Sequence, residues 1–136
     1  MIDSRDENTD FCIMLIDLDH FKNINDKYGH PEADEVLKKL TALLAKLLGD
    51  SNQLYRYGGE EFVALTSGDI DLSMHIAEKI RATVSTTSFN NKIIKISIGL
   101  TNLRDNDTPL SVIDRADKAL LTAKTRGRNQ VYVSNT

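Results

Sequence analysis

The chain has 136 residues, 40% of them hydrophobic, and a formal net charge of −3, which fits one domain with a single core and argues against non-specific nucleic-acid binding. Residues Met1–Asp10 are acidic and polar and hold no apolar segment that would serve as a signal peptide or a membrane span. Cys12 is the one cysteine, which excludes an internal disulfide, so we expect a cytoplasmic domain without membrane contact.

The first predicted element is a strand over residues 11–18, an apolar run without alternation that is typical of a strand covered on both faces. Asp17 lies in phase with Ile13 and Leu15, so we expect its carboxylate to point toward a packed face. A buried carboxylate is costly unless it is paired or binds a cation, and strand-end acids commonly hold Mg²⁺. Asp17 is therefore a candidate metal ligand, whereas Asp19 is interpreted as an ordinary polar strand end.

A helix is predicted over residues 31–48, because Pro31 suits a first helical turn and Gly49 follows the last apolar residue. Apolar residues recur along this segment at steps of three and four, which predicts a buried stripe. The stripe consists of Val36, Leu37, Leu40, Leu43, Leu44, Leu47 and Leu48.

A hairpin is predicted around Gly58 and Gly59, which separate two apolar or aromatic runs. We expect the glycines to supply the positive φ of a tight turn and to let a ligand approach the backbone. Glu60 and Glu61 follow directly, and strand alternation would turn them opposite ways, so they should not share one role. The hairpin pattern alone fits a purely structural turn and a ligand-binding turn equally well.

The second half of the chain predicts a helix over 71–84, a strand over 92–101, a helix over 110–126 and a final strand over 130–133. Thr108 is expected to cap the predicted helix 110–126, with a proline next to it at the first helical position. Gly127 is expected to end this helix. Helices interleaved with strands and one central hairpin predict an α/β, or α+β, fold with a helix-covered mixed sheet.

With these elements in place, the chain resembles the GGDEF-domain diguanylate cyclases in five blocks that occur in the family's order. The resemblance runs from about Phe11 to the C-terminus. The matching blocks are Asp17–Asp26 with Gly29, His30 and Asp34; Arg56–Phe62; Ser97–Gly99; Ala116 and Asp117 with Ala123 and Lys124; and Gly127–Asn129.

The resemblance implies a five-stranded mixed sheet like that of nucleotidyl cyclases and polymerase palms, with a central hairpin carrying the motif Gly58–Phe62. It implies condensation of two GTP molecules into cyclic di-GMP with release of two pyrophosphates. Each domain of a transient homodimer would activate the 3′-hydroxyl of its own GTP to attack the α-phosphate of the other. Two Mg²⁺ or Mn²⁺ ions per active site and an upstream sensory or regulatory domain are also implied, with no nucleic-acid partner.

Carried over by position, the metal ligands would be Asp17, the Leu18 carbonyl and Glu60. Paired divalent ions bind the attacking and leaving oxygens and lower the pKa of the hydroxyl. The resemblance also makes Glu60 the proton acceptor, and we expect Glu61 to support the metal site less directly. Lys22 corresponds to the residue that stabilises transition-state charge.

The same resemblance assigns the nucleotide contacts. Phe21 lies in the loop His20–Lys22, whose backbone N–H groups can face the terminal phosphates. The side chains implied to contact the nucleotide are Asn25, His30, Asp34, Lys124 and Arg128. An amide and a carboxylate suit guanine, because adenine lacks the matching pair of donors.

The residues alone leave simpler interpretations open at several of these positions. Acids such as Asp34 are favoured near a helix N-terminus, and His30 would equally suit a helix start. Lys124 lies where a cation complements a helix C-terminus. The order of the family blocks favours function for Lys124 and Arg128, while Arg126 is interpreted as solvated surface.

Three departures from the family pattern carry expectations. Residues Gly49–Asn52 replace an inhibitory Arg-x-x-Asp site, so we expect no strong product inhibition there. Ala33 replaces a glycine and is expected to narrow the approach of the nucleotide. The family's N-terminal Asp-x-Leu-Thr-x-Leu-x-Asn-Arg segment has no match, so residues 1–136 are interpreted as a single domain without that segment or a sensory domain.

Two other functions are compatible with these residues. A degenerate GGDEF module would bind GTP or a protein partner without turnover. A related cyclase or polymerase-palm enzyme acting on one nucleotide would share the metal ligands but would not need a second active site.

Overall fold

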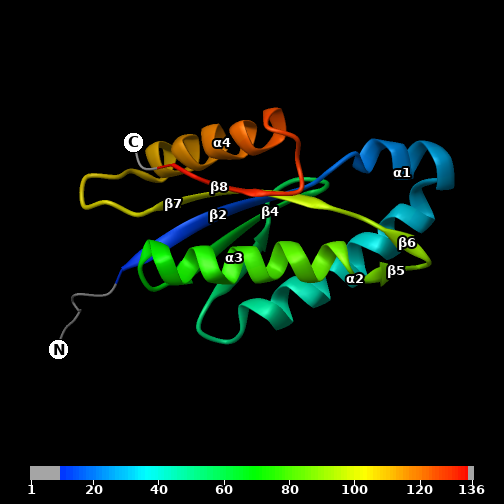
Figure 1. Cartoon of the computed structure of the whole chain (residues 1–136), viewed down its shortest axis with the longest axis horizontal. Coiled ribbons are helices and arrows are strands. Elements are labelled where there is room, and N and C mark those ends of the chain that lie inside the picture. Colours follow the sequence, from blue (N-terminus) through cyan, green and yellow to red (C-terminus); the bar gives the residue numbers. More distant parts are fainter. Residues whose placement is uncertain (1–9, 135–136) are drawn as a thin grey trace.

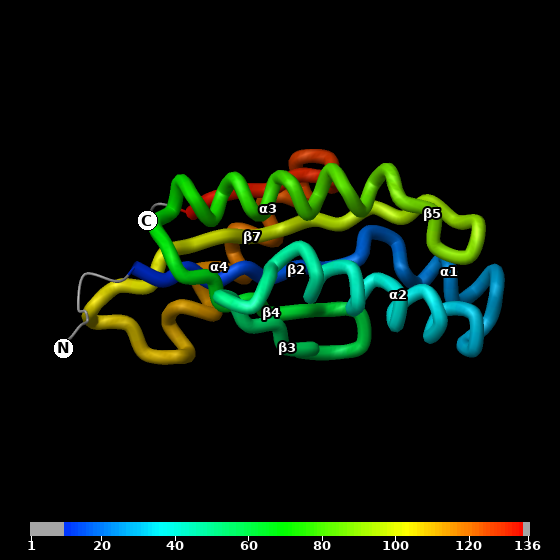
Figure 2. The backbone as a smooth tube through the Cα atoms, turned by 90° about the horizontal axis from the view of Figure 1, so that it is seen from below, coloured from blue at the N-terminus to red at the C-terminus, as the bar shows by residue number. Residues whose placement is uncertain are grey.

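The computed structural model describes residues 10–134, which form a five-stranded sheet with helices on both faces (Figure 1). The central strand is β2 (Phe11–Leu18), with β4 (Glu61–Ser67) and β7 (Ile96–Asn102) antiparallel on its two sides. β3 (Gln53–Arg56) extends the sheet antiparallel to β4, and β8 (Val131–Val133) extends it parallel to β7. Figure 2 shows the order β3-β4-β2-β7-β8. The predicted helix-covered mixed sheet is confirmed.

Three long helices cover the sheet. α2 (His30–Leu48) and α3 (Ile70–Ser85) pack on one face, and α4 (Pro109–Thr125) packs on the other (Figures 1 and 2). Alternation along β2 directs Met14 and Ile16 to the first face, where they join the main core, and Ile13 and Leu15 to the second. The α4 face carries a smaller cluster, which consists of Ile13, Leu15, Val112, Ala116 and Leu120.

Gly99 on β7 explains how closely α4 lies against the sheet. A Cβ atom at this position would lie 2.3 Å from the Leu120 amide nitrogen and 2.4 Å from the Ala116 carbonyl oxygen. Real Cβ atoms do not approach backbone atoms this closely, so only glycine allows the helix to pack at this distance. α4 in turn carries Lys124 to the edge of the sheet where β2 ends.

The long periodic segments match the predicted elements. α2, α3 and α4 begin and end within one residue of the predicted helices, and Thr108 caps α4 in a capping box with Ser111. The predicted strand 92–101 is divided, because β6 (Lys92–Ile93) pairs with β5 (Ser88–Phe89) in a separate two-stranded ladder. The acidic segment noted above lies outside the described residues except for Asp10.

One helix was not predicted. α1 (Phe21–Tyr28) begins directly after His20, so the expected loop His20–Lys22 is instead the start of a helix. Phe21 is buried and Ile24, three residues later, packs partly buried against the main core, but two turns of helix are too short for this spacing to outweigh the expected loop. α1 and the β5–β6 ladder lie at the same end of the molecule (Figures 1 and 2).

Candidate active site

The acidic motif residues meet where β2 ends and β4 begins. In the register of the two strands Asp17 lies directly opposite Glu61, and the Leu18 amide donates to the Glu60 carbonyl oxygen over 3.4 Å. Asp17, Leu18, Glu60 and Glu61 therefore gather at one edge of the sheet, beneath the hairpin loop 57–60. This juxtaposition depends on the antiparallel pairing of segments that lie far apart in the sequence.

Asp17 is an unusually placed carboxylate, because the residue is only 5% exposed and its side chain points to the α4 face. One oxygen accepts a hydrogen bond from Lys124 Nζ, but Oδ1 is buried and has no hydrogen-bond partner among residues 10–134. Burial raises the pKa of Asp17 above its usual value, the neighbouring Glu60 and Asp19 add to the rise, and Lys124 opposes it. An unpartnered buried carboxylate oxygen in an acidic environment fits a cation as its missing partner.

Glu61 shares this environment. Burial is the main cause that raises the pKa of Glu61, and the negative charges of Asp17 and Glu60 raise it further. Its Oε1 lies 3.4 Å from where a Cβ on Gly58 would be, so the carboxylate lies against the hairpin backbone. Glu60 precedes the strand and is partly exposed.

The expected reason for the two motif glycines is wrong in one respect. Neither Gly58 nor Gly59 adopts a positive φ, because the chain turns over residues 57–60 and does not need a tight two-residue turn. The hairpin is closed instead by the Tyr57 and Gly58 amides, both of which donate to the Glu61 carbonyl oxygen. Gly59 faces open space, which leaves the backbone accessible to a ligand.

The predicted metal ligands would supply only part of a coordination shell. Within residues 10–134 no cluster of three or more His, Cys, Asp or Glu side chains is suited to hold a metal ion by itself. Two carboxylates and one carbonyl oxygen suit Mg²⁺, which keeps several positions for water and substrate phosphates. The unpartnered Oδ1 of Asp17 is the observation that fits such an ion.

The predicted nucleotide contacts lie on α1 and α2. His30 Nδ1 is 3.0 Å from Asn25 Oδ1, which joins the end of α1 to the first residue of α2, and Asp34 is exposed one turn further along. Ala33 is 1% exposed and belongs to the main core. Its methyl group therefore packs inward, contrary to the expectation that it narrows the approach of the nucleotide.

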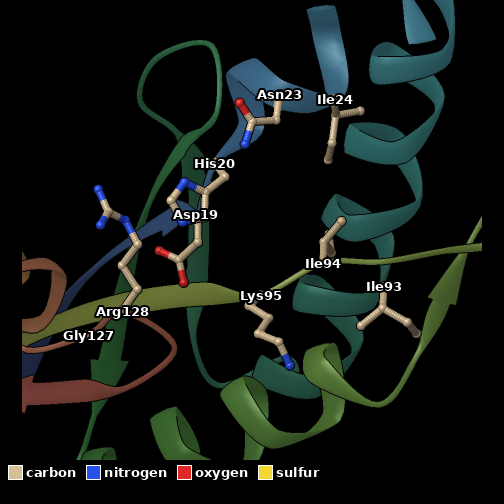
Figure 3. Close-up of a pocket in the computed structure, with 9 residues that line it drawn as sticks. All are labelled: Asp19, His20, Asn23, Ile24, Ile93, Ile94, Lys95, Gly127 and Arg128. Carbon is tan, nitrogen blue, oxygen red and sulfur yellow. The ribbon is translucent and has the colours of Figure 1, made fainter. Parts of the chain in front are cut away.

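The predicted phosphate-binding cations come from both ends of the chain. Lys22 is exposed in the first turn of α1, next to the buried Phe21. Lys124 already pairs with Asp17, whereas Arg128 lies in the turn after α4 and borders a pocket of about 360 Å³ (Figure 3). That pocket is lined by Asp19, His20, Asn23, Ile24, Ile93, Ile94, Lys95, Gly127 and Arg128.

The interpretation of Asp19 as an ordinary polar strand end is wrong. The residue is 8% exposed, and its two carboxylate oxygens accept hydrogen bonds from the Ser97 hydroxyl and the Asn129 amide. No spacing in the sequence connects these three residues. The sheet register brings Ser97 beside the end of β2, and the turn after α4 brings Asn129.

None of the helices in the described part of the chain has both the length and the apolar character needed to cross a bilayer.

Similar proteins support the resemblance. The family model described as "Diguanylate cyclase, GGDEF domain" matches residues 2–130. The chain is 38% identical over 135 residues to the probable diguanylate cyclase DgcT of Escherichia coli, covering 93% of this chain and 30% of DgcT. It is 38% identical over 137 residues to diguanylate cyclase A of Treponema denticola, covering 96% of this chain and 37% of that protein. The chain thus spans about a third of the length of these relatives.

Solved structures share the fold. The active GGEEF domain of a diguanylate cyclase from Vibrio cholerae matches with a TM-score of 0.87 at 32% identity. The match covers 97% of this chain and 86% of the Vibrio cholerae chain. The GGDEF domain of DgcB from Caulobacter crescentus, solved in complex with c-di-GMP, has a TM-score of 0.89 at 29% identity, with coverage of 96% and 81%. The family model, the relatives and the motif geometry agree, and the chain belongs to the GGDEF-domain family of diguanylate cyclases.

Proposed function

We propose that this chain condenses two GTP molecules into cyclic di-GMP and releases two pyrophosphates. Membership of the family supports cyclic di-GMP synthesis in general, and the two matched relatives are named as diguanylate cyclases. The observation that carries the proposal for this chain is the acidic edge at Asp17, Glu60 and Glu61, with a buried Asp17 oxygen that lacks a partner among residues 10–134.

The family generally uses divalent metal ions. In this chain Asp17, the Leu18 carbonyl and Glu60 would hold two Mg²⁺ or Mn²⁺ ions. When bound, such ions neutralise phosphate charge and lower the pKa of a coordinated hydroxyl.

The protein's own groups would bind and orient the nucleotide. Glu60 would accept the proton of the 3′-hydroxyl, because it lies in the hairpin loop before β4, whereas Glu61 is the first residue of β4 and pairs opposite Asp17. Lys22, Lys124 and Arg128 would bind phosphate oxygens, and Lys22 would stabilise the charge that develops during transfer.

Recognition of guanine would fall to Asn25 and Asp34, with His30 fixing the amide of Asn25 through their contact. A carboxylate accepts from N1–H and the exocyclic amine of guanine. Adenine would leave the carboxylate unpaired, so ATP should be a poor substrate.

Each domain would present one GTP, so the product would require two domains to meet. We therefore propose a transient homodimer, whose formation an upstream regulatory domain would control. The GTP substrate also favours a cytoplasmic location.

The test incubates concentrated protein with GTP and Mg²⁺ and measures cyclic di-GMP and pyrophosphate by mass spectrometry. The rate per enzyme molecule should rise with protein concentration if two half-sites must meet. GTP binding without any product would identify a degenerate binding module. A product made from a single nucleotide would identify a cyclase that works without a partner site.

A further inference from the structure

We infer that Asp19 is a positioning residue that fixes the turn carrying Arg128, so that the Arg128 guanidinium faces the bound triphosphate. The inference rests on the proposed function, because phosphate is the group that Arg128 would bind. It concerns a residue outside the predicted site, and it assigns Asp19 no contact with the metal ions or with the substrate.

Both carboxylate oxygens of Asp19 accept a hydrogen bond from the protein. Its Oδ1 accepts from the Ser97 hydroxyl at 2.7 Å and its Oδ2 accepts from the Asn129 amide at 2.9 Å. The Asn129 amide lies 3.2 Å from the Ser97 hydroxyl oxygen as well, so the three residues form a closed triangle. Asp17, two residues earlier, has an unpartnered oxygen instead. The two acids therefore differ, because both oxygens of Asp19 are hydrogen-bonded within the protein and one oxygen of Asp17 is not.

The turn held by this triangle needs such support. Gly127, Arg128 and Asn129 have φ values of +121°, +62° and +49°. Left-handed backbone is unfavourable for a residue with a side chain, so two consecutive left-handed residues persist only where other contacts hold them.

Two hydrogen bonds bracket Arg128 in this strained backbone. The Arg128 amide donates to the Ala123 carbonyl oxygen at 3.0 Å, which ties the turn to the end of α4. The Asn129 amide donates to Asp19, which ties the other side of the turn to the end of β2. Loss of the second bond would remove the link to Asp19 and leave this side of the turn held by Ser97 and by the Arg81 guanidinium, which donates to Asn129 Oδ1 at 3.1 Å.

The side chain of Arg128 depends on this backbone for its direction. Within residues 10–134 its guanidinium makes no hydrogen bond or ion pair. In Figure 3 it extends from the turn past Asp19 and alongside His20, at the border of the pocket beneath the start of α1. A guanidinium without side-chain partners can reach only the region around its own Cα, and Asp19 helps to place that Cα through Asn129.

The test compares nucleotide binding in four proteins: wild type, Asp19→Asn, Arg128→Ala and the double variant. A non-hydrolysable GTP analogue with Mg²⁺ and guanosine alone are titrated by calorimetry. Asp19→Asn should weaken binding of the analogue about tenfold, which corresponds to about 1.4 kcal/mol, and should leave guanosine binding unchanged. In the Arg128→Ala background the same substitution should have almost no further effect, because the residue acts through Arg128.

Further variants separate this role from a general structural one. Ser97→Ala removes one hydrogen bond to Asp19 and leaves the charge of Asp19 in place. It should give a smaller loss of affinity for the analogue, and this loss should also disappear in the Arg128→Ala background. Arg126→Ala removes an equal charge from an exposed neighbour whose guanidinium carbon lies 5.0 Å from the centre of the Tyr132 ring, and it should leave affinity unchanged. Equal losses of analogue and guanosine, or additive losses in the double variant, would overturn the inference.

A ligand-free measurement keeps the inference testable if the proposed function itself fails. Hydrogen exchange at the Asn129 amide should be protected in wild type and about tenfold faster or more in Asp19→Ala, with Asp19→Asn in between, because asparagine retains one acceptor. Unchanged exchange in Asp19→Ala would refute the positioning role directly. Wild-type protein that binds no GTP analogue would instead refute the proposed function.

Discussion

Lys124 on α4 donates to the carboxylate of Asp17 on β2, a contact that joins residues 107 positions apart in the sequence. The Asp17 side chain is 7% exposed and the Lys124 side chain 27% exposed, so the lysine can leave toward solvent while the acid cannot. The protein's own cation thus occupies one oxygen of the proposed metal ligand. It would have to move when phosphates and metal ions arrive.

Removing this cation should strengthen metal binding in the absence of nucleotide. Lys124→Met keeps most of the side-chain length and removes the charge that competes for Asp17. We expect Mn²⁺ to bind Lys124→Met about fivefold more tightly than wild type, which corresponds to about 1 kcal/mol. Electron paramagnetic resonance of free Mn²⁺ during a titration measures this affinity directly.

Lys118→Met is the matched control, since Lys118 lies on the same helix with a 76% exposed side chain and pairs with Asp114. It should leave Mn²⁺ affinity unchanged. Weaker Mn²⁺ binding in Lys124→Met would mean that the lysine organises the site and does not compete for it.

The buried charge of Asp17 should make the metal-free protein less stable at neutral pH. Its folded pKa is raised above the ordinary 3.8, so its contribution to stability is fully present below that value and is lost as pH rises through the raised pKa. The neutral amide of asparagine resembles the protonated acid, so Asp17→Asn should raise the free energy of unfolding at pH 7 by about 1 kcal/mol and flatten its fall above about pH 4.

Urea unfolding across this pH range, without divalent ions, checks the prediction. Asp19→Asn is the informative comparison, because both oxygens of Asp19 accept hydrogen bonds and its substitution should destabilise the protein. If Asp17→Asn proves less stable than wild type at neutral pH, the Lys124 contact outweighs the cost of burial.

Glu60→Gln should abolish turnover and spare the fold. The change removes the proposed proton acceptor and a metal-ligand charge but almost no volume, and Glu60 is partly exposed. Cyclic di-GMP formation should fall by about 100-fold or more, with the free energy of unfolding within about 0.5 kcal/mol of wild type. Glu61→Gln should lower the rate less. Undiminished synthesis by Glu60→Gln would remove Glu60 from its assigned role.

Gly99→Ala should destabilise the domain by about 3 kcal/mol, because its methyl group would meet the backbone of α4. Gly59→Ala is the control: a Cβ there meets nothing within 4 Å, so stability should change by less than about 0.5 kcal/mol. Chemical denaturation of both variants measures the difference. Equal stability would show that α4 can shift away from β7 at little cost.

Cyclic di-GMP should not inhibit this enzyme strongly through the turn 49–52. Asn52 stands where the inhibitory site has its aspartate, and its amide is already used: Nδ2 donates to the Leu48 carbonyl oxygen and Oδ1 accepts from the Ser67 amide. Initial rates measured with added product test this. Inhibition that survives substitution of Asn52 would point to a different product site.

The order of the residues alone is enough to predict the long elements and to identify the motif. A strand buried on both faces, three helices with apolar stripes and a glycine-containing hairpin follow from the spacing of apolar residues and glycines. A helix or strand buries apolar residues at its own period whatever the fold, so this spacing can be recognised in the sequence. Family order then named Asp17, Glu60 and the cations as candidates. None of this required knowing which strands pair.

The contacts of the polar groups, in contrast, depend on how the chain folds. The pairing of β2 with β4 sets Asp17 opposite Glu61, α4 brings Lys124 to Asp17, and the turn after α4 brings Asn129 to Asp19. Such contacts join residues far apart in the chain, and their geometry depends on strand register and helix packing. A local pattern carries no information about either, so the role of Asp19 became visible only once the chain was folded.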